Sequence, residues 1–128
     1  MQNPRFKNYF INRFADLLNT AYLPERLSEK EQLMYNEMAK EMPKEYARWG
    51  DPNNIDQQMN AFRENHLTLN AEYRCRGQKV RNFIQNNYQF PNQVEVTLDT
   101  YPAGAGKIKI STIIPNKLPW KGIYFTQI

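Results

Sequence analysis

Acidic side chains are the residues of this chain whose chemistry would matter most if the fold brought two of them together. Paired carboxylates can act as general acid and base or hold Mg²⁺, and five are candidates: Asp16, Glu37, Glu41, Asp51 and Asp56. Their spacing defines no catalytic pair. Lys40 and Lys44 follow Glu37 and Glu41 at three residues, a spacing typical of ion pairs on a helix surface. We therefore expect these carboxylates to be solvated or paired rather than catalytic.

The single histidine and the single cysteine offer little metal or redox chemistry. One cysteine excludes an internal disulfide and a cysteine-based zinc site. His66 falls on an apolar stripe, so we expect a hydrogen-bonded core histidine. Cys75 has cationic neighbours that could activate a thiol, but it has neither a histidine partner nor a second cysteine. We expect it to be buried or inert.

A glycine-lysine segment, Gly104-Ala105-Gly106-Lys107, resembles part of a phosphate-binding loop. The motif requires a glycine where this chain has Tyr101, and it requires Ser or Thr after the lysine, where this chain has Ile108. Alternating residues flank the segment on both sides, so the pattern favours a β-hairpin turn in which glycine supplies the positive φ.

The densest basic patch is Arg74, Arg76, Lys79 and Arg81, with aromatic residues nearby. Interleaved arginines and aromatics can hold a phosphate backbone, which makes nucleic-acid binding a third hypothesis. Basic side chains are also ordinary on the outer face of a helix, and a net charge of +4 is too small to argue for nucleic acid. Nucleic acid is therefore not the partner we expect.

Large aromatic residues lie near the ends of the expected elements. Trp49 and Trp120 are expected to fix the packing of a helix and of the last strand. Tyr101 and Tyr124 could instead be exposed and bind a protein or a polysaccharide. These two tyrosines support a second hypothesis, an interaction module.

Composition indicates a folded protein of one domain, or one small domain with an appendage. The chain has 128 residues, of which 41% are hydrophobic and 13% aromatic, which is enough for a core and argues against disorder. The first five residues are polar, and no apolar run reaches the length of a membrane span. We therefore expect no membrane partner for this segment.

Three helices are predicted over the first two-thirds. The first begins at Asn3-Pro4 and carries a stripe from Phe6 to Leu18. The second begins near Ser28, where Ser28 and Glu31 match a capping box, and Pro43 should kink or restart it. It ends at Gly50.

The third helix is predicted to start near Asn53 or Asn54 and to run for roughly 30 residues, with a bend near Gly77 or packing along both shorter helices. Its apolar seam runs from Ile55 to Ile84 and includes His66. We expect the apolar stripes of all three helices to form one core.

The last third changes to a period of two. Residues 94–98 and 107–111 alternate and are expected to form a hairpin, with 123–125 as a third strand. The predicted fold class is therefore α+β: three main helices, the last long or kinked, followed by a small antiparallel β-sheet of about three strands. The sequence ends on apolar residues in mid-strand, so we expect the chain to be a piece of a longer polypeptide.

Several motifs, in order, resemble the CotH kinase family, atypical kinases named for a spore-coat protein. Residues 10–20 (FINRFADLLNT) resemble its "nRxaDLLNT" stretch, and residues 41–43 with 47–50 are similar to its "EMP…RWG". Residues 76–84 look like its "R…vR..I", although the family often has proline where this chain has Gly77. Residues 94–125 look like the β segment that follows the kinase region in many secreted bacterial members.

The resemblance implies a location rather than an activity for this segment. These motifs belong to the carboxyl-terminal helical part of the kinase unit, whereas the family's ATP-contacting lysine and Mg²⁺-binding residues lie upstream. No catalytic, cofactor or metal residue carries over, and ATP and Mg²⁺ would belong to the upstream part. The resemblance also implies a secreted or cell-surface parent. The structural motif residues are expected to be Arg13, Asp16, Arg48, Trp49, Arg76 and Trp120.

The leading functional hypothesis is therefore non-catalytic. Residues 1–90 would be a helical buttress for an upstream kinase core of the same polypeptide, and residues 91–128 a β module, possibly followed by a further β domain. Within the buttress we expect Asp16 to form a buried or half-buried ion pair with Arg13 and Arg48.

Overall fold

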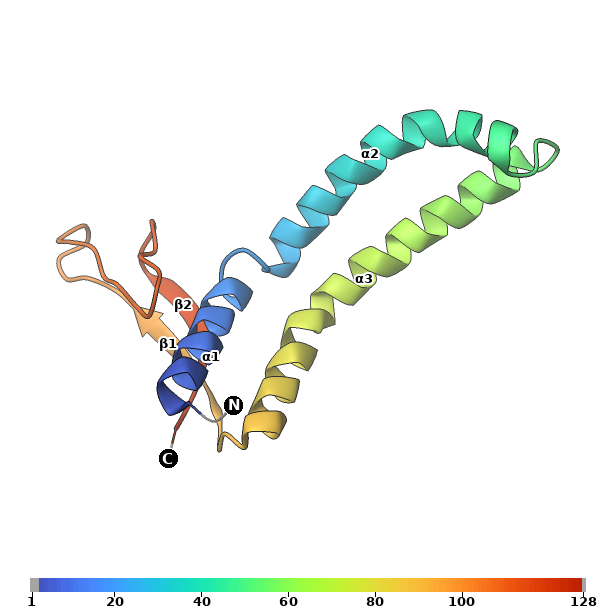
Figure 1. Cartoon of the computed structure of the whole chain (residues 1–128). Helices are drawn as coiled ribbons and strands as arrows, with labels where there is room; N and C mark the ends of the chain where they lie inside the picture. The colour runs from blue at the N-terminus through green and yellow to red at the C-terminus, as the bar shows by residue number, and fades with distance from the viewer. Residues whose placement is uncertain (1–2, 128) are drawn as a thin grey trace. The chain divides into compact units, whose positions relative to one another are not determined.

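The computed structural model describes residues 3–127 and has the predicted α+β class. Three helices precede two strands (Figure 1), in the order α1 (Pro4–Leu18), α2 (Pro24–Trp49), α3 (Ile55–Tyr88), β1 (Gln93–Leu98) and β2 (Trp120–Phe125). Over residues 3–127, none of the helices combines the length and the apolar character that a bilayer span requires. Ile128, part of the expected strand end, lies outside the described residues.

The chain forms two compact units, which corrects the expectation of one helical core. The sheet unit comprises residues 3–23 and 77–127, and the hairpin unit comprises Pro24–Arg76. Helix α3 is continuous through Gly77 and contributes to both. The apolar stripes do not merge, because Met38 is 49% and Trp49 72% exposed. Apolar spacing identifies the apolar face of a helix, but it does not tell which other element packs against that face.

Helix α1 begins as predicted, but a different face is buried. The side-chain Oδ1 of Asn3 accepts hydrogen bonds from the backbone N–H groups of Arg5 (3.0 Å) and Phe6 (3.2 Å), as an N-cap does ahead of proline. The buried apolar residues are Ile11, Ala15 and Leu18, whereas Phe6 is 56% exposed. The phenylalanine stripe is therefore largely an outer face of α1.

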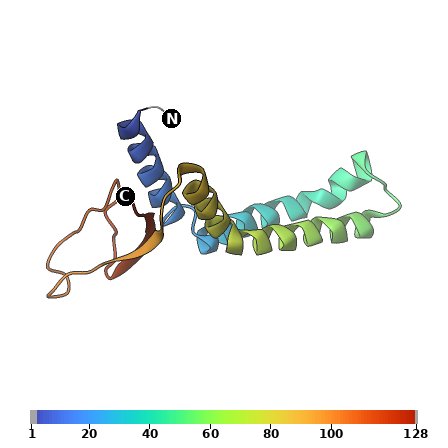
Figure 2. The ribbon, with the colours of Figure 1, turned by 90° about the horizontal axis from the view of Figure 1, so that it is seen from below.

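In the hairpin unit, α2 and α3 run side by side in opposite directions (Figure 2). Helix α2 starts at Pro24, one turn before the predicted Ser28, because proline is suited to the first helical position. It continues through Pro43, and Figure 1 shows it curving in its second half. The helix ends at Trp49, where the N–H of Gly50 donates to the Tyr46 carbonyl (3.0 Å).

The turn between α2 and α3 is organised by a carboxylate. Asp51 accepts hydrogen bonds from the Asn53 N–H (2.9 Å) and the Asn54 side chain (2.5 Å). These bonds lower the pKa of Asp51, the Asn54 bond most, because they stabilise the ionised form. This carboxylate, one of the five candidates, thus shapes a turn.

The sheet has two strands within residues 3–127, and the predicted hairpin partner of β1 is wrong. Strand β1 pairs antiparallel with β2, with Val94 opposite Tyr124 and Leu98 opposite Trp120. Residues 107–111 form no strand. There the chain turns back on itself, with a positive φ at Ser111 and reciprocal backbone bonds between Ile110 and Ile113 (3.0 Å). The whole segment 99–119 is a loop, and its turn at Gly104 has the expected positive φ of 80°.

Candidate functional site

A buried carboxylate lies at the centre of the sheet unit. Asp16 is 0% exposed, and a charge in that position is costly unless hydrogen bonds compensate it. Its Oδ1 accepts from the Tyr124 hydroxyl (2.6 Å), and its Oδ2 accepts from the backbone N–H (2.9 Å) and the hydroxyl (2.6 Å) of Thr112. Asp16 therefore ties α1 to loop 99–119 and to β2.

The expected ion pair of Asp16 with Arg13 and Arg48 is wrong. Neutral donors satisfy the carboxylate, and Arg13 donates instead to the Thr112 hydroxyl (2.8 Å), which in turn donates to Asp16. Arg48 belongs to the hairpin unit, where its guanidinium lies 5.0 Å from the centre of the Trp49 ring. The sequence motif placed the carboxylate correctly in the interior, but it did not reveal donors from residues 112 and 124.

Tyr124 is a buried donor, not the exposed aromatic that the interaction-module hypothesis requires. Only 8% of the residue is exposed. Burial, followed by the hydrogen bond to Asp16 and the charge of that carboxylate, raises the pKa of the Tyr124 phenol well above its usual range. The phenol stays protonated in the folded state and cannot present itself to a partner.

This raised pKa predicts a loss of stability at alkaline pH. In the unfolded chain Tyr124 ionises near pH 10, whereas in the folded chain it keeps its proton at that pH. The folded state then binds more protons, so the free energy of unfolding falls as the pH rises above about 10. Urea denaturation from about pH 9 to about pH 11 should show this slope, reduced in Tyr124→Phe. Tyr101→Phe, at a residue that is 99% exposed, should keep it, and an equal slope in both variants would contradict the prediction.

Asn19 closes the outer edge of β2. Its side-chain Nδ2 donates to the Ile123 carbonyl (2.8 Å), and its Oδ1 accepts from the Ile123 N–H (3.0 Å). The same Oδ1 accepts from Arg81 (3.0 Å). Burial lowers the pKa of Arg81. Arg81 is therefore half-buried in the sheet unit and does not stand free in a basic surface patch.

The buried Asp16 carboxylate does not fit a Mg²⁺ ion. A Mg²⁺ ion needs an open carboxylate oxygen and room for several waters. Both oxygens of Asp16 are occupied by protein donors, and its side chain has no exposed surface. Over residues 3–127, no three or more His, Cys, Asp or Glu side chains are grouped so that they could hold a metal ion.

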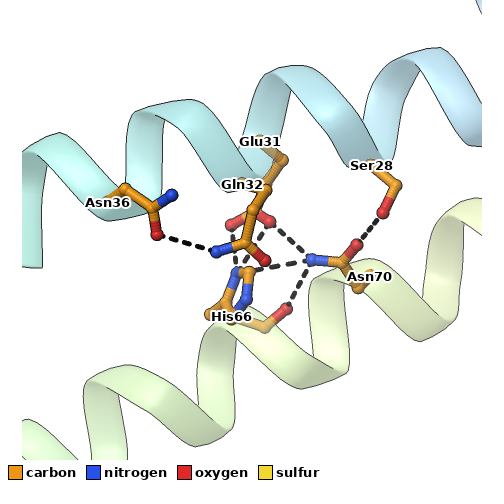
Figure 3. Close-up of polar contacts among 6 residues, drawn as sticks. All are labelled: Ser28, Glu31, Gln32, Asn36, His66 and Asn70. Atoms are coloured by element: carbon orange, nitrogen blue, oxygen red, sulfur yellow. Dashed lines mark hydrogen bonds and ion pairs between the residues drawn. The ribbon is translucent and has the colours of Figure 1, made fainter.

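The hairpin unit contains a second polar cluster, between α2 and α3. Figure 3 shows Ser28 and Glu31 of α2 pointing toward His66 and Asn70 of α3. The His66 Nδ1 lies 2.8 Å from Glu31 Oε1, and the Asn70 amide donates to Glu31 Oε2 (2.5 Å). The Ser28 hydroxyl donates to the side-chain Oδ1 of Asn70. The cluster cross-links the two helices.

This cluster confirms one prediction and overturns another. His66 is 8% exposed and hydrogen-bonded, as expected of a core histidine. Ser28 and Glu31 are not a capping box, because α2 already started at Pro24 and both side chains reach α3 instead. Tyr35 stacks on the His66 ring at a centroid distance of 4.0 Å, which adds an apolar contact to the polar ones.

Beside the cluster, the hairpin unit has an apolar groove of about 450 Å³. Its walls are mostly aliphatic and aromatic side chains, with Glu31 and His66 also in the lining; the apolar residues include Leu27, Met34, Met38, Phe62 and Leu69. Met34 is 65% exposed and Met38 is 49% exposed, and both line this groove.

The other predicted site residues are dispersed. Tyr101 is 99% exposed, as expected. Trp120 lies half-buried over Gly122, where an added Cβ would come within 2.3 Å of the indole ring.

The charged candidates and the cysteine lie outside the two clusters. Arg76 and Lys79 are exposed on α3, and Arg74 lines a small groove with Ser28 and Asn70. The expected surface pairs form, Glu37–Lys40 and Glu41–Lys44 each at 2.9 Å, and the half-buried Cys75 thiol contacts the Glu72 carbonyl (3.5 Å).

Thr112, Asn19, Glu31 and Asn70 are central to the two clusters, yet no motif singled them out as partners. Two spacings did carry a signal. Asp16 and Asn19 lie three residues apart on one face of the first helix, and His66 and Asn70 lie four apart on the third, so each pair shares one helix face.

Two features define the class of this protein: an α+β fold, and buried polar clusters that tie its elements together. The family described as CotH kinase protein matches residues 1–91, so the chain belongs to the CotH kinase family. Neither the curated proteins nor the solved structures contain a match.

Proposed function

We propose that this chain is a non-catalytic structural segment of a CotH-family protein kinase. In this proposal its helices buttress an upstream kinase core of the same polypeptide, and its sheet unit leads toward a further β domain. One observation supports the proposal most directly: polar side chains of the family-like motif, residues 10–20, hold the sheet unit together.

Three polar residues of that motif recur at every third position along α1 and its C-cap residue, Asn19. Arg13 donates to Thr112, Asp16 accepts from Thr112 and Tyr124, and Asn19 pairs with the backbone of Ile123. The motif thus forms a docking face of α1 for residues 112–124. Side chains committed to such bonds hold elements in register and are not available to a substrate.

Isothermal titration of the isolated chain with ATP and Mg²⁺ tests the proposal. We expect no binding in the micromolar range, because the buried Asp16 carboxylate has no oxygen to offer a metal. An Asp16→Asn variant serves as the matched control. Micromolar binding by the wild-type chain would overturn the non-catalytic assignment, and its loss in an Asp16→Asn variant that circular dichroism shows to be folded would place the nucleotide site at this carboxylate.

A second candidate function is binding of a protein or polysaccharide through Tyr101. The residue is 99% exposed and lies beside a turn in loop 99–119, where an aromatic ring gains nothing from the core. Tyr124 no longer supports this candidate because it is buried. A glycan array or pull-down signal that is lost in Tyr101→Ala would favour it over the structural role.

A further inference from the structure

The two outer edges of the sheet are not alike. On β2, the N–H and C=O of Ile123 point away from β1, since both bond the Asn19 side chain. Helix α1 therefore closes the outer edge of β2 at its middle residue. Within residues 3–127, no side chain bonds the outer backbone edge of β1 in this way.

The direction of the β1 backbone groups follows from the register. Ile123 lies opposite Glu95, and because Ile123 bonds outward, this is a non-hydrogen-bonded pair of the antiparallel ladder. The N–H and C=O of Glu95 then also point outward, on the side away from β2, and so do those of Thr97, two residues along. Across residues 3–127, no backbone or side-chain group bonds these outward-facing groups.

The side chains beside this edge are exposed or half-buried and alternate in character. On one face Val94 is 39% exposed, and Val96 and Leu98 follow it at a spacing of two. On the other face Glu95 pairs with Lys121 (2.8 Å) and still keeps 55% of its side chain exposed. An unpaired edge flanked by partly exposed apolar side chains is a template for another strand.

We propose that the outer edge of β1 binds an extended segment of another polypeptide, which adds to the sheet as a third strand. Strand addition would satisfy the outward N–H and C=O groups of Glu95 and Thr97, and a two-stranded sheet gains most from it. The segment alternates apolar residues, which pack beside Val94 and Val96, with basic residues, one of which lies beside Glu95. Residues 107–111 do not fill this edge, because Ile110 and Ile113 bond each other.

A proline substitution tests the proposal selectively. In Thr97→Pro the outward donor is lost while the inward bonds of β1 to β2 remain, since an edge strand tolerates proline at a position whose N–H faces outward. Thr97→Val keeps the donor and is the matched control. The probe is a fluorescent, end-capped seven-residue peptide that alternates valine with lysine and threonine, titrated into the full chain and followed by anisotropy.

We expect the peptide to bind the wild-type chain and Thr97→Val, and to bind Thr97→Pro at least tenfold more weakly. Hydrogen exchange should show that the bound peptide slows exchange of the Glu95 and Thr97 amides. A peptide N-methylated at alternate residues lacks its own donors and should not bind, a test that does not depend on the folding of any variant. Equal binding to Thr97→Pro, or by the N-methylated peptide, would overturn the proposal. So would an absence of wild-type binding at millimolar peptide, or protection of these amides by raised protein concentration alone, which would identify a second copy of this chain as the occupant.

Discussion

Replacing Asp16 by alanine should destabilise the sheet unit by about 3 to 4 kcal/mol, because bonds to a charged acceptor contribute about 1.5–3 kcal/mol each and buried donors left without a partner add to the loss. The substitution removes the acceptor of the Tyr124 hydroxyl and of both Thr112 donors. The Tyr124 hydroxyl would remain in the interior without an alternative partner of comparable strength, whereas Thr112, an exposed residue, can turn its donors to water.

Urea denaturation followed by Trp120 fluorescence measures this effect, in a Trp49→Phe background so that only the sheet unit reports. Glu64→Ala, at an exposed residue of α3, is the control and should change the free energy of unfolding by less than about 0.5 kcal/mol. An unchanged denaturation midpoint for Asp16→Ala would show that the three bonds contribute no net stability.

Replacing Asn19 by alanine should cost about 2 to 3 kcal/mol, since it leaves two half-buried backbone groups of Ile123 unpaired. The Arg81 guanidinium also loses its acceptor. The Ile123 amide should then exchange with solvent much faster than the inward-facing amide of Tyr124, because only the former depends on Asn19.

Asn8 offers a matched control on the same helix. Its Oδ1 accepts an exposed hydrogen bond from Gln127 (3.1 Å), and exposed bonds contribute little. Asn8→Ala should therefore stay within about 0.5 kcal/mol of the wild type. Hydrogen exchange of Ile123 that is equally slow in both variants would contradict the role given to Asn19.

The helices and the first strand could be predicted from the sequence because their signals are local. Asn3-Pro4 marks the start of α1, Gly50 marks the end of α2, and the alternation at residues 94–98 marks β1. Local alternation also predicted a strand at 107–111, where it was wrong. A strand needs a partner, and the bridge between Ile110 and Ile113 shows that this segment bonds itself instead.

The polar clusters could be predicted only in part, because their bonds join residues far apart in sequence. His66 was correctly expected in a core, and Asp16 in an interior position. Their partners were not predictable, since the hydrogen bond from Tyr124 to Asp16 spans 108 residues and that from Asn70 to Glu31 spans 39. Periodicity reports which face of a helix is apolar and carries no information about a donor from a distant loop.

The sheet unit is assembled from both ends of the chain, with residues 24–76 inserted between its two parts. Bringing α1 to β2 therefore closes a loop of more than 100 residues, an entropic cost that is met only when the last strand is available. As the chain leaves the ribosome, the hairpin unit can fold from local contacts while α1 still has its carboxylate in water. We expect β2 to be the element whose arrival completes the sheet unit.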